Sequence, residues 1–253
     1  MLGQPTNLLL ERLSPAYRTY LMSRLRQVEL PLRRVLYKAD EAPPFAHFIT
    51  SGIASVVTSM SNGASTEVGI WGKEGLVESF HLLGSARMPT HCYIQVAATA
   101  LRMPFRDLQK EFDESEELRG CVLQGVQSHG AILGQLAGCN RLHEAEQRLA
   151  RWLLMVSDRV ESDNFLLTQE ILATMLGARR TTVTAAAGML KRKGLITYTR
   201  GRMHIVDPIG LENVACECYK TLRNLYSNFY PEIAVSESLV LVKNASVVMS
   251  GTR

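Results

Sequence analysis

Residues 168–204 carry the pattern that most restricts the fold. It consists of two short helical segments separated by a glycine, followed by a stretch in which apolar and polar residues alternate. Thr168 can cap the N-terminus of the first segment, and Gly177 can end it, because glycine accepts the left-handed conformation found at helix C-termini. The second segment begins at Arg179. Apolar residues at helical spacing would pack the two segments together: Ala173, Leu176, Val183 and Leu190. This spacing predicts a helix-turn-helix, whose second helix enters the major groove of DNA N-terminus first.

The stretch after the second helix predicts a β-hairpin. Gly194-Leu195-Ile196 ends the helix, and the sequence then alternates over residues 196–205 around a turn at Arg200-Gly201. Arg200 and Arg202 flank this turn, where a wing would press on the phosphates of DNA. Helix, turn, basic helix and basic wing together are a strong signal, whereas either half alone would be weak.

Positive charge is concentrated in the same segment. The chain of 253 residues has a net charge of +4, but residues 1–140 hold 13 basic and 13 acidic residues and are neutral. Residues 168–204 hold seven Lys and Arg residues against one acid, Glu170. A compact basic segment beside a neutral one suggests a polyanionic partner, most simply double-stranded DNA. The alternative is a basic face exposed to solvent.

Nine residues of this segment are predicted to contact DNA. They lie at the start of each helix and around the hairpin turn, where Arg, Thr and Gln side chains offer donors to base edges and phosphates. These residues are Thr168, Gln169, Arg179, Arg180, Thr181, Thr182, Thr184, Arg200 and Arg202.

The N-terminal half follows a β pattern. After a helix that begins at Ser14-Pro15, residues 31–104 form short β-rich runs that end at turns such as Ser51-Gly52 and Asn62-Gly63. Asn-Gly tolerates the positive φ of a tight hairpin. Short strands joined in this way predict an antiparallel roll, and the chain as a whole is predicted to have an α+β fold.

A long helix is predicted after the roll, with a heptad pattern of apolar and small residues. The pattern consists of Leu118, Val122, Gly125, His129, Ile132, Leu136 and Cys139. Such a seam predicts pairing with the same helix of a second chain. Glycines at 130, 134 and 138 recur on a neighbouring face and each cost about 1 kcal/mol in a helix, which close approach of a second helix would offset. The alternative is one amphipathic helix lying on its own domain.

The five cysteines predict neither a disulfide framework nor a metal centre. They lie at positions 92, 121, 139, 216 and 218, an odd number with irregular spacing. Cys216 and Cys218 form the only close pair, and two ligands are half of a zinc site at best. We therefore expect no metal and no cofactor, and thiols packed on or near a helix in a reducing compartment.

The sequence also bears on location and on catalysis. No apolar run approaches the roughly 18 residues of a membrane span. The N-terminus lacks a basic start and a clean apolar stretch, so no secretory signal is expected, and a cytoplasmic protein without a membrane partner is predicted. No nucleophile–base spacing, phosphate loop or metal motif supports an enzyme, and no catalytic residues are predicted.

Several runs are similar to the Crp–Fnr family of bacterial transcription regulators (catabolite activator and fumarate–nitrate regulator), over roughly residues 8–220. These runs include Cys139-Asn140-Arg141-Leu142-His143, Arg148-Leu149-Ala150-Arg151-Trp152-Leu153-Leu154, Met175-Leu176-Gly177 and Arg180-Thr181-Thr182-Val183-Thr184. The resemblance implies a β-roll of the cyclic-nucleotide-binding type, a long dimerisation helix and a winged helix-turn-helix. It also implies a homodimer on a twofold DNA site, with RNA polymerase as a further partner if the protein is an activator.

The resemblance divides the chain into four parts. They are a sensor-type β-roll at 1–114, a dimerisation helix at 115–140, a DNA-binding domain at 141–230 and a C-terminal extension at 231–253. The extension contains strand-like runs at 238–242 and 246–249 that lie outside the resemblance.

The sequence departs from the family in its effector site. Members that bind cyclic nucleotides hold the ribose with a Gly-Glu-Leu turn and the phosphate with an Arg-Ser-Ala turn. Leu76 stands where the Glu is expected, and His91 and Cys92 fall near the phosphate turn, so these three residues are the candidate effector pocket. A buried phosphate without its Arg loses a charge-assisted pair, and cyclic AMP is not the expected effector. No cysteine precedes Cys92, which also disfavours the iron–sulfur sensor of the family.

Two forms of regulator remain open. In one, the β-roll senses a ligand that is not a cyclic nucleotide. In the other, the roll is purely structural and the protein binds DNA without any ligand.

Overall fold

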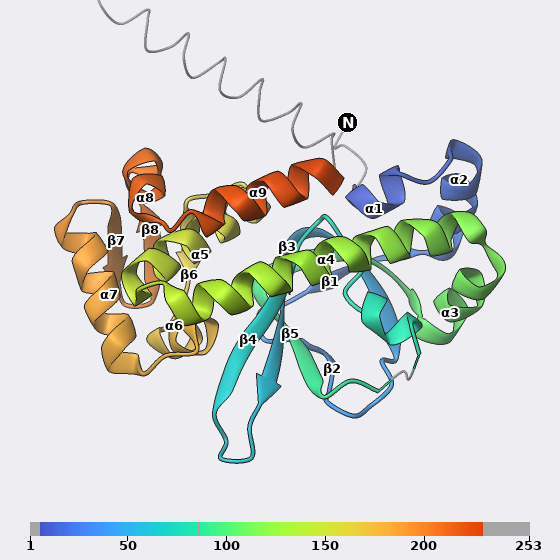
Figure 1. The fold of residues 1–253 in the computed structure, drawn as a ribbon. Coiled ribbons are helices and arrows are strands. Elements are labelled where there is room, and N and C mark those ends of the chain that lie inside the picture. Colours follow the sequence, from blue (N-terminus) through green and yellow to red (C-terminus); the bar gives the residue numbers. More distant parts are fainter. Residues whose placement is uncertain (1–5, 85–86, 230–253) are drawn as a thin grey trace, which may run out of the picture.

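The computed structural model describes residues 6–84 and 87–229, which form an N-terminal β-roll and a C-terminal helical domain joined by one long helix (Figure 1). The strands of the roll are β1 (Arg26–Leu30), β2 (Val35–Tyr37), β3 (Phe45–Ser59), β4 (Ser65–Trp71) and β5 (Thr90–Pro104). They pair antiparallel in the order β1-β5-β3-β4, and β2 also pairs with β5. The predicted α+β fold with an antiparallel roll is confirmed.

One predicted turn is instead a bulge inside a strand. Ser51-Gly52 does not end a strand, because β3 runs through it with a shift of register against β5. Gly52 has a φ of +79°, and a Cβ there would lie 2.3 Å from the carbonyl oxygen of Ala97. Glycine therefore lets β3 bend closely over β5. The expected hairpin at Asn62-Gly63 does join β3 to β4, and Gly63 has a φ of +82°.

Short helices close one end of the roll. They are α1 (Leu8–Glu11), α2 (Pro15–Arg24), the 3₁₀ turn η1 (Ser79–Leu82) and α3 (Phe105–Glu114). Ser14 caps α2, as its sequence predicts, by accepting a hydrogen bond from the backbone N–H of Tyr17 at 3.4 Å. Leu21 of α2 and Phe105 of α3 pack with Phe48 of β3 in one buried cluster.

The long helix α4 (Glu116–Leu142) crosses the molecule from α3 to the C-terminal domain (Figure 1). Ser115 caps its start by accepting from the backbone N–H of Leu118 at 3.2 Å. The helix continues to Leu142, slightly beyond the predicted end at residue 140.

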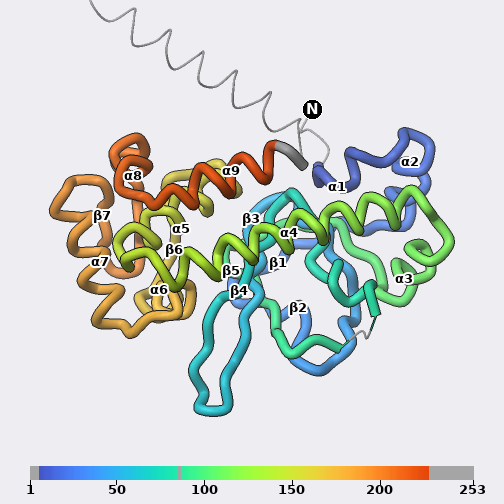
Figure 2. Tube along the Cα trace, in the orientation of Figure 1, coloured from blue at the N-terminus to red at the C-terminus, as the bar shows by residue number. Residues whose placement is uncertain are grey.

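The C-terminal domain is a helix-turn-helix followed by a β-hairpin, as predicted. Its elements are α5 (Ala145–Val160), β6 (Asn164–Leu166), α6 (Gln169–Leu176), α7 (Arg180–Arg192), β7 (Ile196–Thr199), β8 (Arg202–Ile205), α8 (Pro208–Val214) and α9 (Cys218–Phe229). The three strands pair in the order β6-β8-β7. Helix α9 returns from this domain and runs beside α4 (Figure 2).

The two domains share part of one apolar core. Ile53 of β3 and Ile70 of β4 lie in the same buried cluster as Leu153 of α5 and Leu172 of α6. Burying one such side chain contributes about 1.5–3 kcal/mol. The roll therefore helps to hold the helix-turn-helix in place.

The strand-like runs of the extension at 231–253 lie outside the described residues. Within residues 6–84 and 87–229, no helix combines the length and apolar character needed to cross a bilayer.

Candidate nucleic-acid interface

Two caps set the turn between α6 and α7. The side chain of Thr168 accepts a hydrogen bond from the backbone N–H of Ile171 at 3.2 Å and so begins α6. Gly177 ends α6 in the left-handed region, with a φ of +55°. Its N–H and that of the next residue bond to carbonyls of the last turn of α6. The chain then re-enters a helix almost at once, as a helix-turn-helix requires.

Helix α7 has one buried face and one exposed face. Val183, Ala186, Ala187 and Leu190 are buried against the domain. All nine residues predicted to contact DNA are exposed: Thr168, Gln169, Arg179, Arg180, Thr181, Thr182, Thr184, Arg200 and Arg202. No described side chain caps the N-terminus of α7, so its first N–H groups face solvent beside two arginines. A helix N-terminus of this kind favours an anion.

Arg180 already has one weak partner on the protein. Its guanidinium lies 3.4 Å from a carboxylate oxygen of Glu170, and the two side chains are 65% and 71% exposed. Exposed pairs of this kind contribute about 0–1 kcal/mol. Arg180 can therefore exchange Glu170 for another acceptor at little cost.

The hairpin after α7 has the geometry of a tight wing. Arg200 and Gly201 form its two-residue turn and have φ values of +51° and +78°, which is the pattern of a type I′ turn. The hydroxyl of Tyr198 donates to the carbonyl of Leu167 at 3.0 Å, and the N–H of Leu167 donates to the carbonyl of Gly201 at 2.8 Å. These bonds hold the wing beside the start of α6.

Comparisons of sequence and of structure both relate this helix-turn-helix and its wing to known proteins. Residues 147–214 match the family model for the Crp-like helix-turn-helix domain. These residues therefore form a Crp-like helix-turn-helix domain, and the chain shares the fold of solved Crp–Fnr transcription regulators. No curated protein matches it in sequence.

Solved structures of Crp–Fnr regulators share the fold at low sequence identity. The c-di-GMP-responsive global regulator CLP of Xanthomonas campestris has a TM-score of 0.63 and 12% identity, over 76% of this chain and 99% of that one. FixK2 of Bradyrhizobium japonicum has a TM-score of 0.63 and 13% identity, over 76% and 98% of the two chains. A CRP-family transcriptional regulator of Thermus thermophilus has a TM-score of 0.62 and 18% identity, over 75% and 96%.

The Crp–Fnr-type roll contains a small cavity of about 100 Å³ between the sheet and α4. Its described lining is aromatic and apolar, with two imidazoles and no Lys or Arg. The ring-bearing side chains of the lining are Tyr37, Trp71, Phe80, His81 and His129.

The candidate effector residues lie beside this cavity rather than on it. Leu76 is fully buried in the core and forms a bridge with Phe48. Cys92 is fully buried inside the roll, and His91 is half-buried and stacks on Tyr93. Their chain neighbours Val77 and Thr90 do line the cavity.

Both histidines of the cavity are held neutral. The ring of His129 stacks on Trp71 with a centroid distance of 3.9 Å and an interplanar angle of 9°. Burial lowers the pKa of His129 to about 3, with a smaller effect of Arg159. Burial also lowers the pKa of His81, against a smaller opposing effect of Glu78. The cavity thus offers no positive charge to a phosphate.

The heptad residues of α4 face the protein's own core, which differs from the prediction that they pair two chains. Leu118, Val122, Gly125, His129, Ile132 and Cys139 are buried within the chain, and Leu136 is half-buried against the core. The glycine face is the one left open. A Cβ at position 130, 134 or 138 would have no atom within 4 Å among the described residues.

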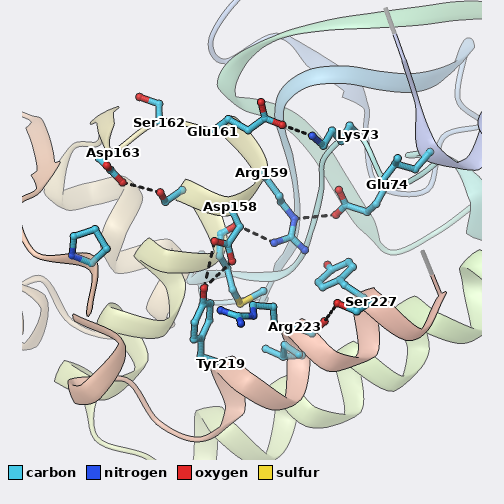
Figure 3. A pocket seen from close by; sticks show the side chains of 16 residues that line it. Lys73, Glu74, Asp158, Arg159, Glu161, Ser162, Asp163, Tyr219, Arg223 and Ser227 are labelled. Atoms are coloured by element: carbon cyan, nitrogen blue, oxygen red, sulfur yellow. Dashed lines mark hydrogen bonds and ion pairs between the residues drawn. The ribbon is translucent and has the colours of Figure 1, made fainter. Parts of the chain in front are cut away.

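A larger cavity of about 640 Å³ lies where the roll, the end of α5 and α9 meet (Figure 3). Arg159 donates from Nε to Glu74 at 2.8 Å, and this pair is buried. The hydroxyl of Tyr219 donates to Asp158 at 3.0 Å, and burial followed by Asp158 raises the pKa of that phenol. No local motif marks these residues in the sequence, because Arg159 and Glu74 are 85 positions apart.

One group of described side chains has the composition of a metal site. Cys139 and His143, at the end of α4, meet Cys216, which lies between α8 and α9, and Cys218, the first residue of α9. Sequence reasoning recognised only the Cys216–Cys218 half of this group.

Proposed function

We propose that this regulator binds a twofold operator as a homodimer and inserts α7 of each chain into the major groove. The exposed first turn of α7 carries the proposal, because it presents Arg180, Thr181 and Thr184 beside an uncapped helix N-terminus. Arg180 would read a guanine edge, and the Thr side chains would contact bases or phosphates. Arg200 and Arg202 of the wing would contact phosphates and fix the register.

We place the homodimer contact on the glycine face of α4. Gly130, Gly134 and Gly138 are exposed on the described surface, and each weakens the helix by about 1 kcal/mol relative to Ala. Close approach of the same helix from a second chain would offset that cost. The heptad face is already covered by the protein itself and supports the packing of α4 on the roll.

We propose that the roll acts without a cyclic nucleotide. Ligand pockets usually measure about 300–1,000 Å³, whereas the cavity in the roll holds about 100 Å³ and its described lining has no basic side chain. These features argue against a cyclic nucleotide in the roll. If the protein activates transcription, RNA polymerase is its further partner.

Selection of bound fragments from genomic DNA tests the proposed function. The purified full-length protein should enrich a motif with twofold symmetry, with half-sites about one helical turn apart. Enrichment of an asymmetric motif, or of no motif above that found with Arg180→Ala, would contradict it.

A further inference from the structure

Three thiols and one imidazole converge between the two helices that link the domains. They are Cys139, His143, Cys216 and Cys218, here called the Cys3His cluster. The sulfur atoms of Cys139 and Cys216 are 3.5 Å apart, and the sulfur of Cys218 is 3.6 Å from Nδ1 of His143. One ligand atom from each of the four residues lies within 4.8 Å of the other three.

These separations fit the edges of a tetrahedron around one ion. Zinc binds sulfur at about 2.3 Å and imidazole nitrogen at about 2.0–2.1 Å, which places two sulfur ligands about 3.8 Å apart and sulfur about 3.6 Å from nitrogen. The four ligands of an iron–sulfur cluster are divided between two or more iron atoms, so they do not all lie as close together as the corners of one tetrahedron. Cys3His is also a donor set that structural zinc sites use.

Outer partners orient the ligands of the cluster. The second ring nitrogen of His143, Nε2, lies 3.1 Å from a carboxylate oxygen of Glu217. This leaves Nδ1 facing the sulfurs, as in the carboxylate–histidine–zinc arrangement. The amide of Gln135 donates to the sulfur of Cys218 at 3.0 Å. The three cysteines are 1–3% exposed, so water has little access to them.

A buried arginine nearby supplies a matching charge. Arg151 is 3% exposed and forms no close ion pair among the described residues, although it lies near enough to the buried carboxyl of Glu67 to interact with it. Buried charges are usually paired. Three thiolates and one divalent ion would carry a net charge of −1, and Arg151 lies close enough to Cys139 to interact with that charge.

We propose that the Cys3His cluster binds one Zn²⁺ ion in tetrahedral coordination. The four protein ligands close the coordination shell, which is the form of a structural rather than a catalytic zinc site. The ion ties the end of α4 to the start of α9, and so holds the DNA-binding domain against the helix proposed to carry the dimer contact.

Metal analysis of the full-length protein is the first test. Protein purified without chelators or a metal-affinity column should contain one zinc per chain. Cobalt(II) added to the metal-free protein should give the visible bands of a tetrahedral ion and the near-ultraviolet absorption of cobalt–thiolate bonds. The proposal is overturned by iron with acid-labile sulfide in the protein, by a Cys139–Cys216 disulfide, or by metal-free protein that gives no cobalt–thiolate absorption.

Single substitutions test which residues hold the ion. Cys216→Ser should lose the zinc, whereas Cys121→Ser should keep it, because Cys121 lies on α4 outside the cluster. Unchanged zinc in Cys216→Ser, or equal loss in both variants, would overturn the assignment.

A milder substitution covers the case in which Cys216→Ser does not fold. Glu217 is 75% exposed, so Glu217→Gln should fold normally. It should weaken zinc binding about 10–100-fold in competition with a chelator. An unchanged affinity would overturn the assignment of Nδ1 of His143 as a ligand.

Discussion

Arg180 occupies the first position of α7, where its side chain is 65% exposed and paired with the exposed Glu170. Its neighbours on the buried face of the helix hold α7 in place, while the guanidinium can leave the domain surface. Arg can donate two hydrogen bonds to the O6 and N7 atoms of one guanine, which makes it the commonest specific contact in the major groove. The specificity of this regulator is therefore expected to depend most on this one residue.

Replacement of Arg180 should affect specific binding much more than non-specific binding. We expect Arg180→Ala to cost about 1–3 kcal/mol at the selected operator and much less on random DNA. Arg192→Ala, at the last position of the same helix, is the matched control and should have a small effect on both. Fluorescence anisotropy at one fixed salt concentration measures these affinities. Equal losses on the two DNAs would mean that Arg180 contacts only phosphate.

His129 makes the stability of the roll depend on pH. The folded protein holds this ring neutral with a pKa of about 3, whereas the unfolded chain binds the proton near pH 6.5. The unfolded state therefore binds more protons between these values, and the stability that His129 contributes is lost as the pH falls below about 6.5.

His129→Phe should remove this dependence, because Phe keeps a ring on Trp71 and does not titrate. Between pH 6.5 and 5.0 the wild type should lose about 2 kcal/mol more unfolding free energy than the variant. The unfolding free energies of the wild type and the variant have to be compared at each pH, because Glu67 also titrates. Burial raises the pKa of Glu67 to about 7, which changes the stability with pH in the opposite direction. Denaturant unfolding at several pH values measures it. Parallel pH profiles would show that His129 does not titrate in this range.

At the scale of the elements, α4 serves two surfaces at once. One face packs on the roll through residues such as Val122 and Ile132, and the opposite face exposes its glycines. A heptad pattern in the sequence indicates only that one face of the helix is buried. It does not distinguish a covering partner chain from the protein's own sheet.

A bulky charge on the glycine face should separate the dimer without damaging the fold. At Gly134 a new side chain meets no atom within 4 Å in the described chain, and any residue other than proline forms helix better than glycine. Gly134→Glu should therefore sediment as a folded monomer with weaker operator binding. Gly84→Glu, at an equally open glycine in the roll, should remain dimeric. A folded Gly134→Glu variant that stays dimeric would place the contact elsewhere.

At the scale of the whole molecule, the roll and the DNA-binding domain share a core instead of meeting at a wet interface. Trp152 of α5 donates from its indole N–H to Glu67 of β4 at 2.9 Å, and a Cβ at Gly177 would lie 2.7 Å from Thr66. The helix-turn-helix is thus packed directly on the β3–β4 hairpin. This packing suits a regulator whose roll serves as a structural support.

Cyclic nucleotides should not bind to this roll. The phosphate and ribose would leave water for a small cavity whose described lining is aromatic and neutral, which is costly without polar partners. Isothermal titration with cyclic AMP and cyclic GMP should show no heat of binding, and neither should change the affinity for DNA. A micromolar dissociation constant would show that the roll opens to accept them.

Local sequence signals predicted the parts of this fold that depend on neighbouring residues. The caps at Thr168 and Gly177 and the turn at Arg200-Gly201 are local, and the structure has each of them. The Cys3His cluster depends on a contact between Cys139 and Cys216, 77 positions apart, so the pair Cys216–Cys218 alone had no metal-site spacing. The small cavity of the roll is lined by residues of β2, β3, β4, β5, η1 and α4, so sequence position alone did not separate Leu76, which lies in the core, from its neighbour Val77, which lines the cavity.

Methylation protection of guanine N7 in the selected operator tests most directly whether α7 enters the major groove. We expect protected guanines in two symmetric half-sites about one helical turn apart, and loss of that protection with Arg180→Ala. Guanines that remain fully reactive in the bound operator, or protection confined to a single site, would contradict it.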